Sequence, residues 1–510
     1  MMITALILLI ALGVLGWGFY RAIPFGKLGL LAWLQSVVLM APWLMFFGLS
    51  AIGIYLNLAG VLFLLIISVG LYILLGRRLR AVADEESIAK ELSTKELSTI
   101  ANSTMTSDQP DATAEQAVPN LENAAIIKDE PELVSANSAT PPIPAEDLQA
   151  IKGIFGIDTF FVTETIPYQN GVILKGNLRG DPKQSYDRLS VSLKKRMGAR
   201  YRLFLIEGVE NKPVIVVLPS TNDPKPTTVS QAILALVLAV ATIATSMETA
   251  GLLLGFDFFS KLDRYAEALP ISLGIISILA AHEIGHRLLA RYHQIRLSPP
   301  FFIPTWQIGS FGALTRIESI LPDRSVLFDI AFAGPALSGL VALGMLVTGL
   351  VQSHPGSLFQ LPSEFFQGSI LVGTLARVVL GTAVQQPIVD IHPLVIVGWI
   401  GLVITAINLM PAGQLDGGRI VLSIYGRKVA GRTTIATLIV LGLAALVNPL
   451  ALYWAVLILF LQRDLERPAL NELPEPDDAR AALGLLVLFL MAATLLPLTP
   501  SLAGRLGIGG

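Results

Sequence analysis

The chain has 510 residues, of which 53% are hydrophobic, 15% are charged and none is cysteine. So large an apolar share excludes an ordinary soluble enzyme and predicts a mainly α, polytopic helical membrane protein with smaller polar parts. The formal net charge of −2 gives no support to a nucleic-acid partner, and the lack of cysteine excludes disulfides and thiolate metal ligands.

Three apolar runs open the chain, each with about the 20 residues that a membrane-crossing helix needs. They cover about 3–20, 28–49 and 52–75, so we assign 1–80 to N-terminal transmembrane helices. The first run lacks a basic start and a clear cleavage site, so we expect a retained span and not a signal peptide. Arg77, Arg78 and Arg80 mark a cytoplasmic end, which places the N-terminus outside.

The next part of the chain is polar in two different ways. Residues 81–144 contain no aromatic side chain and are predicted to form a disordered linker, because they cannot bury enough apolar surface to fold. Residues 145–227 are predicted to form a small soluble α+β domain on the cytoplasmic side. Its strands are expected at 160–164, 171–178, 201–207 and 213–218, and its helix at 182–197.

The apolar run at 269–289 contains His282-Glu283-Ile284-Gly285-His286. Histidines four residues apart lie on one face of a helix, so both imidazoles can reach one metal ion, with Glu283 beside them. The same pattern also arises by chance on soluble helices. Within a membrane span, however, each acid or base costs roughly 2.5–3.5 kcal/mol, so three such polar groups on one turn indicate a functional metal site.

A catalytic zinc ion takes three protein ligands and one water molecule, so a third ligand must lie elsewhere in the chain. His293 would lie about 10 Å further along the same helix, and His354 and His392 fall in or beside polar loops on the opposite membrane face. Asp416 is the best candidate, because it follows an apolar run at 393–409 and is surrounded by helix-breaking Gly and Pro. Alone it could mark a simple turn, but the incomplete ligand set favours a ligand.

Two further segments are predicted to surround this site. Residues 298–318 are apolar but contain several prolines and glycines, so we expect a re-entrant loop or hairpin that lines the site, with an ordinary interfacial loop as the alternative. The run at 368–384 should be a surface or partly inserted element, because a full crossing would place Asp416 opposite the histidines. The remaining spans are expected at 229–254, 326–351, 393–410 and 481–497, with a hairpin from 435–447 and 450–461.

Three motifs resemble the site-2 protease family of intramembrane zinc metalloproteases. They are His282-Glu283-x-x-His286 in an apolar helix, Ala333-Gly334-Pro335 in a later span, and Asn408-x-x-Pro411 followed by Leu415-Asp416-Gly417. Gly176-Asn177-Leu178-Arg179 further resembles the plastid and cyanobacterial branch, known in plants as the ethylene-dependent gravitropism-deficient proteases. The similarity covers roughly residue 145 onward, and the first 140 or so residues carry none of these motifs.

The resemblance implies Zn²⁺ held by His282, His286 and Asp416, with Glu283 as the catalytic base and Asn408 steadying the substrate or the oxyanion. It also implies substrate binding as an added strand, which we assign to Gly309, Ser310, Phe311 and Gly312.

The expected substrates are single-span membrane proteins cut in or near a locally unwound span. The protein would be embedded in the lipid bilayer of a cyanobacterial plasma or thylakoid membrane, or of a plastid membrane. Arginines follow the His282–His286 motif at 287, 291 and 296, which places the site near the cytoplasmic or stromal face. The sequence makes no prediction of oligomeric state.

Two alternatives belong to other functional classes. A membrane metal transporter would need acidic or histidine groups along several spans, whereas the ligands predicted here collect at one depth. An inactive protease-like scaffold is disfavoured because both histidines, the glutamate and the aspartate are present. Iron or cobalt could occupy such a site in vitro, since ligand type alone does not select zinc.

Overall fold

The computed structural model describes residues 143–508 apart from 169, 209–211, 306, 447 and 463, and, nearer the N-terminus, residues 15–51 and scattered positions between 13 and 79. The chain divides into two compact units, Met1–Pro131 and Glu132–Gly510. In the first unit, the short 3-10 helix η1 (Ile23–Phe25) leads into helix α2 (Gly26–Ala51), so the run predicted at 28–49 is helical. The spans predicted at 3–20 and 52–75 and the linker predicted at 81–144 lie largely outside the described residues.

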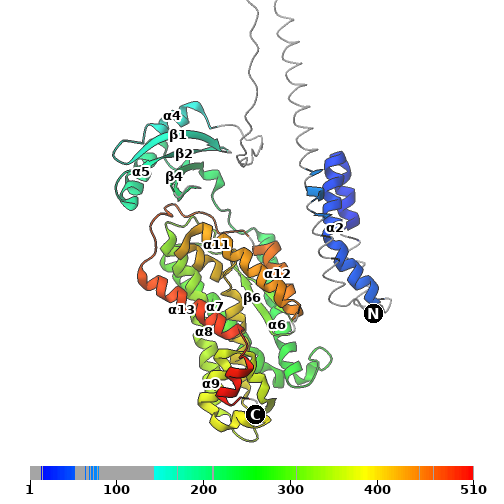
Figure 1. Cartoon of the computed structure of the whole chain (residues 1–510). Helices are drawn as coiled ribbons and strands as arrows, with labels where there is room; N and C mark the ends of the chain where they lie inside the picture. Colours follow the sequence, from blue (N-terminus) through cyan, green and yellow to red (C-terminus); the bar gives the residue numbers. More distant parts are fainter. Residues whose placement is uncertain are drawn as a thin grey trace, which may run out of the picture. The chain divides into compact units, whose positions relative to one another are not determined.

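The second unit begins with a four-stranded antiparallel sheet in the order β1-β2-β4-β3 (Figure 1). The strands are β1 (Phe160–Tyr168), β2 (Gly171–Leu178), β3 (Tyr201–Glu207) and β4 (Pro213–Pro219). Helices α4 (Ala145–Lys152) and α5 (Pro182–Met197) pack on one face of this sheet and bury one apolar core. The predicted strands and helix are confirmed, except that β1 runs on to Tyr168 and that α4 was not predicted.

The start of α5 shows how the sequence sets these boundaries. Asp181 caps the helix, because its carboxylate accepts hydrogen bonds from the backbone N–H groups of Lys183 and Gln184, both at 3.0 Å. Pro182 occupies the first helical position, where no N–H donor is needed. Gly198, with φ of +63°, ends the helix in a conformation that favours glycine.

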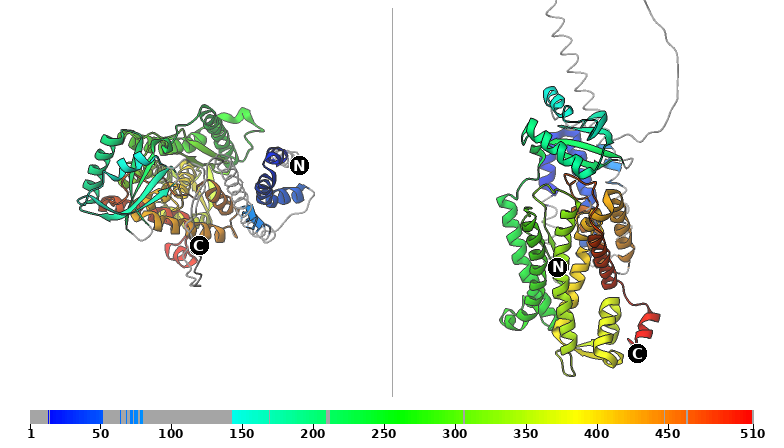
Figure 2. Two further views of the ribbon diagram at one scale, coloured as in Figure 1. Left: turned by 90° about the horizontal axis from the view of Figure 1, so that it is seen from above. Right: turned by 90° about the vertical axis from the view of Figure 1, so that its left-hand side faces the viewer.

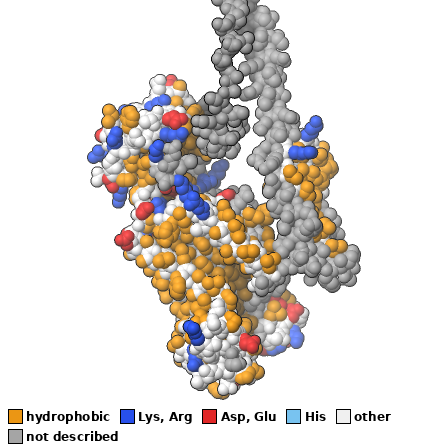
Figure 3. All heavy atoms as spheres, viewed as in Figure 1, with side chains coloured by type: hydrophobic (Ala, Val, Ile, Leu, Met, Phe, Trp, Pro, Cys, Tyr) orange, Lys and Arg blue, Asp and Glu red, His pale blue; other side chains and the backbone are white. Residues whose placement is uncertain are grey.

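Among the described residues, four helical segments are long and apolar enough to cross a membrane. They comprise α6 (Val229–Leu253), α7 (Tyr265–Tyr292, preceded by 3-10 helix η3, Leu262–Arg264), α8 (Arg324–Gln352) and α13 (Asp478–Leu495). Hydrophobic side chains cover much of the helical part in Figure 3. Val229, Leu236 and Val240 of α6 are exposed, as a lipid-facing surface requires. The spans predicted at 229–254, 269–289, 326–351 and 481–497 are therefore confirmed as long apolar helices.

Small residues let α7, α8 and the shorter α10 (Pro393–Asn408) approach closely. A methyl group at Gly285 of α7 would lie 2.3 Å from the carbonyl oxygen of Ala333 on α8. A methyl group at Gly398 of α10 would lie 2.4 Å from the backbone nitrogen of Leu346, also on α8. Close backbone packing of this kind stabilises helix pairs in a membrane. The hydrophobic effect does not drive helices together there, because lipid tails are as apolar as the helix side chains.

The helix α10 ends inside the molecule. Its 16 residues reach about 24 Å, less than the roughly 30 Å of a hydrocarbon core, and a loop at 409–415 then leads into α11 (Asp416–Ala444). The loop N–H groups are satisfied within the protein, because Gly413 donates to Thr434 Oγ1 and Gln414 donates to the carbonyl of Gln462, both at 2.9 Å. The span predicted at 393–410 is thus an apolar helix shorter than a full crossing, and it leads to Asp416 as predicted.

A second antiparallel pair, β5 (Phe301–Thr305) and β6 (Gly309–Leu314), forms a hairpin against α6, as expected for 298–318. The run at 368–384 gives only the 11-residue α9 (Ile370–Leu380) and 3-10 helix η5 (Gly381–Gln385), too short to cross. A short pair β7 (Phe359–Pro362) and β8 (Ile388–Ile391) beside α9 was not predicted.

The predicted C-terminal hairpin exists, but its first arm is the end of α11, which kinks at Gly426 (φ +79°). The remaining short elements are η2 (Ser220–Asn222), η4 (Ser363–Gly368), α12 (Pro449–Leu457), the π-helical turn η6 (Ile458–Gln462) and α14 (Pro500–Leu506). In Figures 1 and 2 the four-stranded sheet lies at one end of the helical part and α9 at the other.

A strap at 470–472 joins the sheet to the helical part. On one side, Leu205 N–H of β3 donates to the carbonyl of Leu470 at 2.8 Å, and Glu472 N–H donates to the carbonyl of Leu205 at 2.9 Å. On the other side, the N–H groups of Leu470 and Asn471 donate to the carbonyls of Leu321 and Pro322, just before α8. The strap thus extends the sheet beyond β3 with main chain that comes from the C-terminal part of the protein.

Candidate metal centre

Three predicted ligand atoms meet in the buried interior between α7 and the start of α11. The Nε2 atoms of His282 and His286 are 3.0 Å apart, and Asp416 Oδ2 lies 3.1 Å and 3.3 Å from them. Among the described residues this is the one group of three histidine or acidic side chains placed to share a metal ion. The structure therefore brings together the two histidines and the aspartate that the sequence predicted separately.

Hydrogen bonds on the far side of each imidazole orient the two rings. His286 Nδ1 lies 2.7 Å from the carbonyl oxygen of Ile330, which can only accept, so Nδ1 carries the proton and Nε2 presents its lone pair. His282 Nδ1 lies 3.2 Å from Ser338 Oγ, which in turn lies 3.0 Å from Thr405 Oγ1. Outer partners of this kind fix the ring orientation of metal-binding histidines.

The donor set fits zinc in both chemistry and spacing. Zinc in proteins takes imidazole nitrogen and carboxylate oxygen at about 2.0–2.1 Å, which in a tetrahedral site places neighbouring ligand atoms about 3.3 Å apart. The three observed separations, 3.0, 3.1 and 3.3 Å, are close to this value. Three protein ligands leave a fourth position open, as a catalytic site requires. A cavity of about 30 Å³ beside His286 and Asp416 has room for a water molecule.

Glu283 lies on the same turn of α7 as His282, and its carboxylate is held by a residue outside this helix. Thr315, just after β6, donates its hydroxyl to this carboxylate, with both oxygens 3.1 Å from Oγ1. Arg287 Nη2 lies 3.6 Å from Glu283 Oε2. Glu283 is buried on the same helical turn as the two histidines.

Asp416 reaches the histidines because the start of α11 packs directly on the preceding loop. A methyl group at Gly417 would lie 1.8 Å from the carbonyl oxygen of Leu409, so only glycine allows this packing. Arg419 lies beside Asp416, with its Nη1 3.8 Å from Oδ1. Arg419 also donates to Glu466 Oε2 at 2.9 Å and to the carbonyl of Thr315 at 3.1 Å.

Asn408 and the predicted substrate-binding residues lie against one another. The Asn408 amide donates to the carbonyls of Phe311 at 3.1 Å and Ile404 at 2.8 Å. The predicted residues Gly309, Ser310, Phe311 and Gly312 form most of β6 and are buried. A second cavity, of about 10 Å³, lies between Gly312, Asn408 and the side chains of His282 and Glu283.

The remaining histidines lie away from the centre, as the sequence predicted. His293 Nε2 lies 3.0 Å from Asp329 Oδ2, His354 is in an exposed turn, and His392 caps α10. Sequence reasoning did not identify Thr315, Ser338 or Arg419. A hydroxyl or an arginine carries no spacing signal for a metal site, although a charged residue three positions after Asp416 is a clue that could have been followed.

Comparisons with known proteins give consistent matches. Residues 270–448 match the family model "Peptidase family M50", and residues 149–225 match "EGY3 middle domain". The chain is 41% identical over 363 residues to "Probable zinc metalloprotease EGY2, chloroplastic" of Arabidopsis thaliana, covering 70% of this chain and 65% of that protein. It is 36% identical over 408 residues to "Probable zinc metalloprotease EGY1, chloroplastic" of the same plant, covering 71% and 73%.

A third relative, "Probable zinc metallopeptidase EGY3, chloroplastic" of Arabidopsis thaliana, is 31% identical over 379 residues, covering 69% of this chain and 66% of that protein. The chain thus spans about two thirds of the length of the curated relatives that it matches, at 65% and 66% for two of these three. No solved structure matches the chain.

Proposed function

Because this chain belongs to peptidase family M50, we propose that it is an intramembrane zinc metalloendopeptidase. The membership confirms the resemblance to site-2 proteases that the motifs indicated. One observation carries the proposal: two imidazole nitrogens and one carboxylate oxygen lie within 3.3 Å of one another, buried beside a second carboxylate in an apolar helical setting.

In this proposal His282, His286 and Asp416 hold the zinc ion, which when bound supplies Lewis-acid activation of water and of the substrate carbonyl. Glu283 accepts a proton from the attacking water and later returns it to the leaving amine. Thr315 keeps the Glu283 carboxylate oriented toward the centre through its hydroxyl, at 3.1 Å. The peptide bond breaks to give one new carboxylate and one new amine.

The substrate is a single membrane span that has locally unwound, because helical carbonyls are hydrogen-bonded and covered by side chains. Strand β6 offers main-chain groups beside the centre, and an extended segment can add to such a strand. Asn408 acts on this strand as a positioning residue, since its amide holds the carbonyl of Phe311. The four residues Gly309 to Gly312 then contact the substrate.

The proposed location is a plastid membrane, which the relatives named chloroplastic support. The plasma or thylakoid membrane of a cyanobacterium is the alternative. The proposed site faces the stromal or cytoplasmic side. Arginines at the end of α7, Arg287 and Arg291, support this orientation. A metal transporter is less consistent with the fold, because a transport path needs further ligand groups and the described residues contain a single such cluster.

The test compares the reconstituted native chain with three variants, using tagged single-span peptides and a zinc assay. Glu283→Gln should retain zinc but lose cleavage, because the base is removed and the ligands are not. Asp416→Asn should lose both, and His354→Gln, in an exposed turn, should behave like the native chain. Zinc bound without cleavage of any peptide by the native chain would contradict the protease assignment, and no zinc after metal loading would contradict the centre itself.

A further inference from the structure

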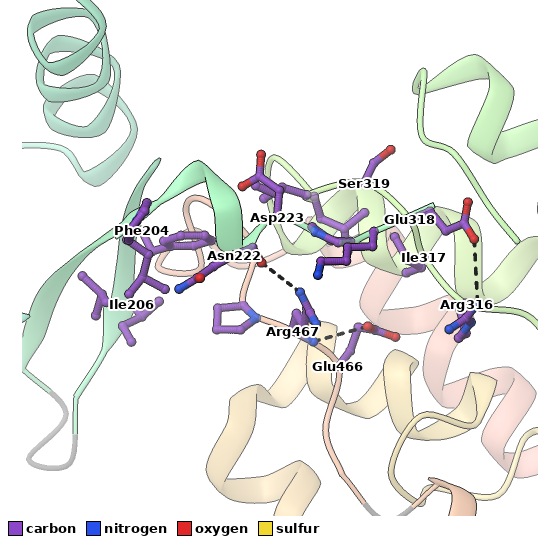
Figure 4. Close-up of a pocket in the computed structure, with 18 of the residues that line it drawn as sticks. Phe204, Ile206, Asn222, Asp223, Arg316, Ile317, Glu318, Ser319, Glu466 and Arg467 are labelled. Carbon is purple, nitrogen blue, oxygen red and sulfur yellow. Dashed lines mark hydrogen bonds and ion pairs between the residues drawn. The ribbon is translucent and has the colours of Figure 1, made fainter. Parts of the chain in front are cut away.

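A cavity of about 1030 Å³ lies between the four-stranded sheet and the helical part. One wall is the sheet face opposite α4 and α5, on which no helix packs among the described residues. This wall is apolar and alternates along the strands, with Phe204 and Ile206 from β3 and Val216 and Leu218 from β4. Figure 4 shows Phe204 and Ile206 on one side of the cavity and charged side chains on the other.

The opposite wall connects the cavity to the metal centre. It is formed by the segment that leaves β6, including Arg316 and Glu318, and by Gln414 and Arg419. Arg316, Gln414 and Arg419 also border the small cavity beside His286 and Asp416. Arg419 Nη1 is 3.8 Å from Asp416 Oδ1, so a single side chain separates the large cavity from a proposed metal ligand.

The described side chains that line the cavity include more positive than negative charge that is not neutralised by an ion pair. Its acidic side chains are already bound: Asp223 pairs with Arg202 at 2.9 Å, Glu466 pairs with Arg419 at 2.9 Å, and Glu318 accepts a hydrogen bond from Thr227. Arg316 lies 4.0 Å from Glu318 and donates to Gln231 Oε1 at 3.2 Å, so it is already engaged. The remaining cations of the lining are Lys225 and Arg467. The Arg467 guanidinium donates to the carbonyl of Asn222 at 3.2 Å, and the backbone N–H of Arg467 donates to Glu466 Oε1 at 3.3 Å (Figure 4). Among the described residues, the Arg467 side chain itself forms no ion pair with a carboxylate.

We propose that this cavity binds the juxtamembrane segment of the substrate, on the cytoplasmic side of the cut bond, as an extended peptide with apolar and acidic residues. The inference rests on the proposed protease function. Apolar side chains pack against Phe204, Ile206, Val216 and Leu218, and a carboxylate binds Arg467 across the cavity.

An extended peptide suits this cavity better than a lipid headgroup does. The apolar wall repeats at the spacing of strand side chains, which matches alternate residues of an extended chain. The site also continues directly into the centre where the peptide bond must lie. Such binding selects substrates by the sequence beside the membrane span, in addition to the unwinding of the span itself.

The experiment uses the reconstituted full chain and two peptides with one shared membrane span. One carries a Leu- and Glu-containing juxtamembrane segment, and the other carries a Ser- and Gly-rich segment. The native chain should show a KM lower by about tenfold or more for the acidic peptide, as one charge-assisted contact gives. Arg467→Glu should abolish this difference between the two peptides. Lys195→Gln, exposed on α5 at the other face of the sheet, is the matched control.

A charge exchange sharpens the test, because a peptide with Lys in place of Glu should be favoured by Arg467→Glu. Equal effects on both peptides, or no effect, would overturn the proposal. Binding is measured in parallel as anisotropy of the labelled acidic segment on the Glu283→Gln protein, so that a failure of cleavage does not hide the cavity. Lost binding in Arg467→Glu supports the site even without cleavage. No binding, with an Arg467-dependent response to anionic vesicles, would overturn it in favour of a lipid site.

Discussion

Replacing Gly334 with alanine tests the geometry of the metal centre without changing any proposed ligand. Gly334 lies in α8, directly against the His286 ring. An added methyl carbon would lie 2.3 Å from His286 Nε2 and 2.5 Å from Cε1. Ordinary carbon–nitrogen contacts begin at about 3.4 Å, so the ring or the helix must shift by about 1 Å.

A shift of this size exceeds what the site can absorb. Zinc sites hold their ligand distances to about ±0.2 Å, and a misplacement of 1 Å at a reacting centre can reduce the rate by about 100-fold. We therefore expect Gly334→Ala to lower kcat/KM by about 100-fold or more and to weaken zinc binding. The change should not weaken α8 through helix propensity, because alanine favours a helix over glycine by roughly 1 kcal/mol.

The assay compares peptide cleavage, zinc content and thermal stability with those of Gly344→Ala. Gly344 lies in the same helix, and a methyl group there meets nothing within 4 Å. This control should keep its activity and zinc. If Gly334→Ala cleaves peptides as fast as Gly344→Ala, His286 is not held where the structure places it, and the argument from ligand spacing is wrong.

Two further predictions concern the hydroxyl beside Glu283 and the sheet. Thr315→Val should retain zinc but lower kcat by about tenfold or more, since the carboxylate loses its orienting donor, and Thr315→Ser should largely restore it in the same cleavage assay. Burial and the hydrogen bond to Asp147 raise the pKa of Tyr201 to about 12 from 10.0. The folded state keeps this phenol proton more tightly, so stability should fall between pH 10 and 12, and Tyr201→Phe should lessen the fall in denaturation curves.

The ligands could be predicted because their signals are local or stand out against an apolar background. His282, Glu283 and His286 share one helical turn, and Asp416 is a charged residue in a helix break between apolar runs. Thr315 and Ser338 gave no such signal, because single hydroxyls are ordinary in membrane helices and loops. Their partners, Glu283 and His282, lie 32 and 56 residues away, and only the folded chain brings them together.

In the fold, too, the elements with a clear local sequence pattern could be predicted, and those without one could not. Alternating apolar residues predicted β2 and β3 to the residue, because one face of each strand is buried. The end of β1 was placed too early, at 164, whereas the strand runs through the proline at 167 to Tyr168. Proline is tolerated there since β1 is an edge strand of the sheet. The paired strands β7 and β8 have four residues each, too few to show an alternating pattern in the sequence.

Because of the strap at 470–472, the folded sheet domain does not end where the family match ends. The match to the EGY3 middle domain ends at residue 225, as if this region were a detachable module. Its edge strand β3, however, forms hydrogen bonds with the strap, whose residues lie more than 200 positions later in the chain. An expressed fragment that stops at 225 would leave the edge of β3 with bare main-chain donors and acceptors, which invites pairing between copies. A fragment meant to fold alone should therefore include the 470–472 segment, joined by a linker so that it can pair with β3.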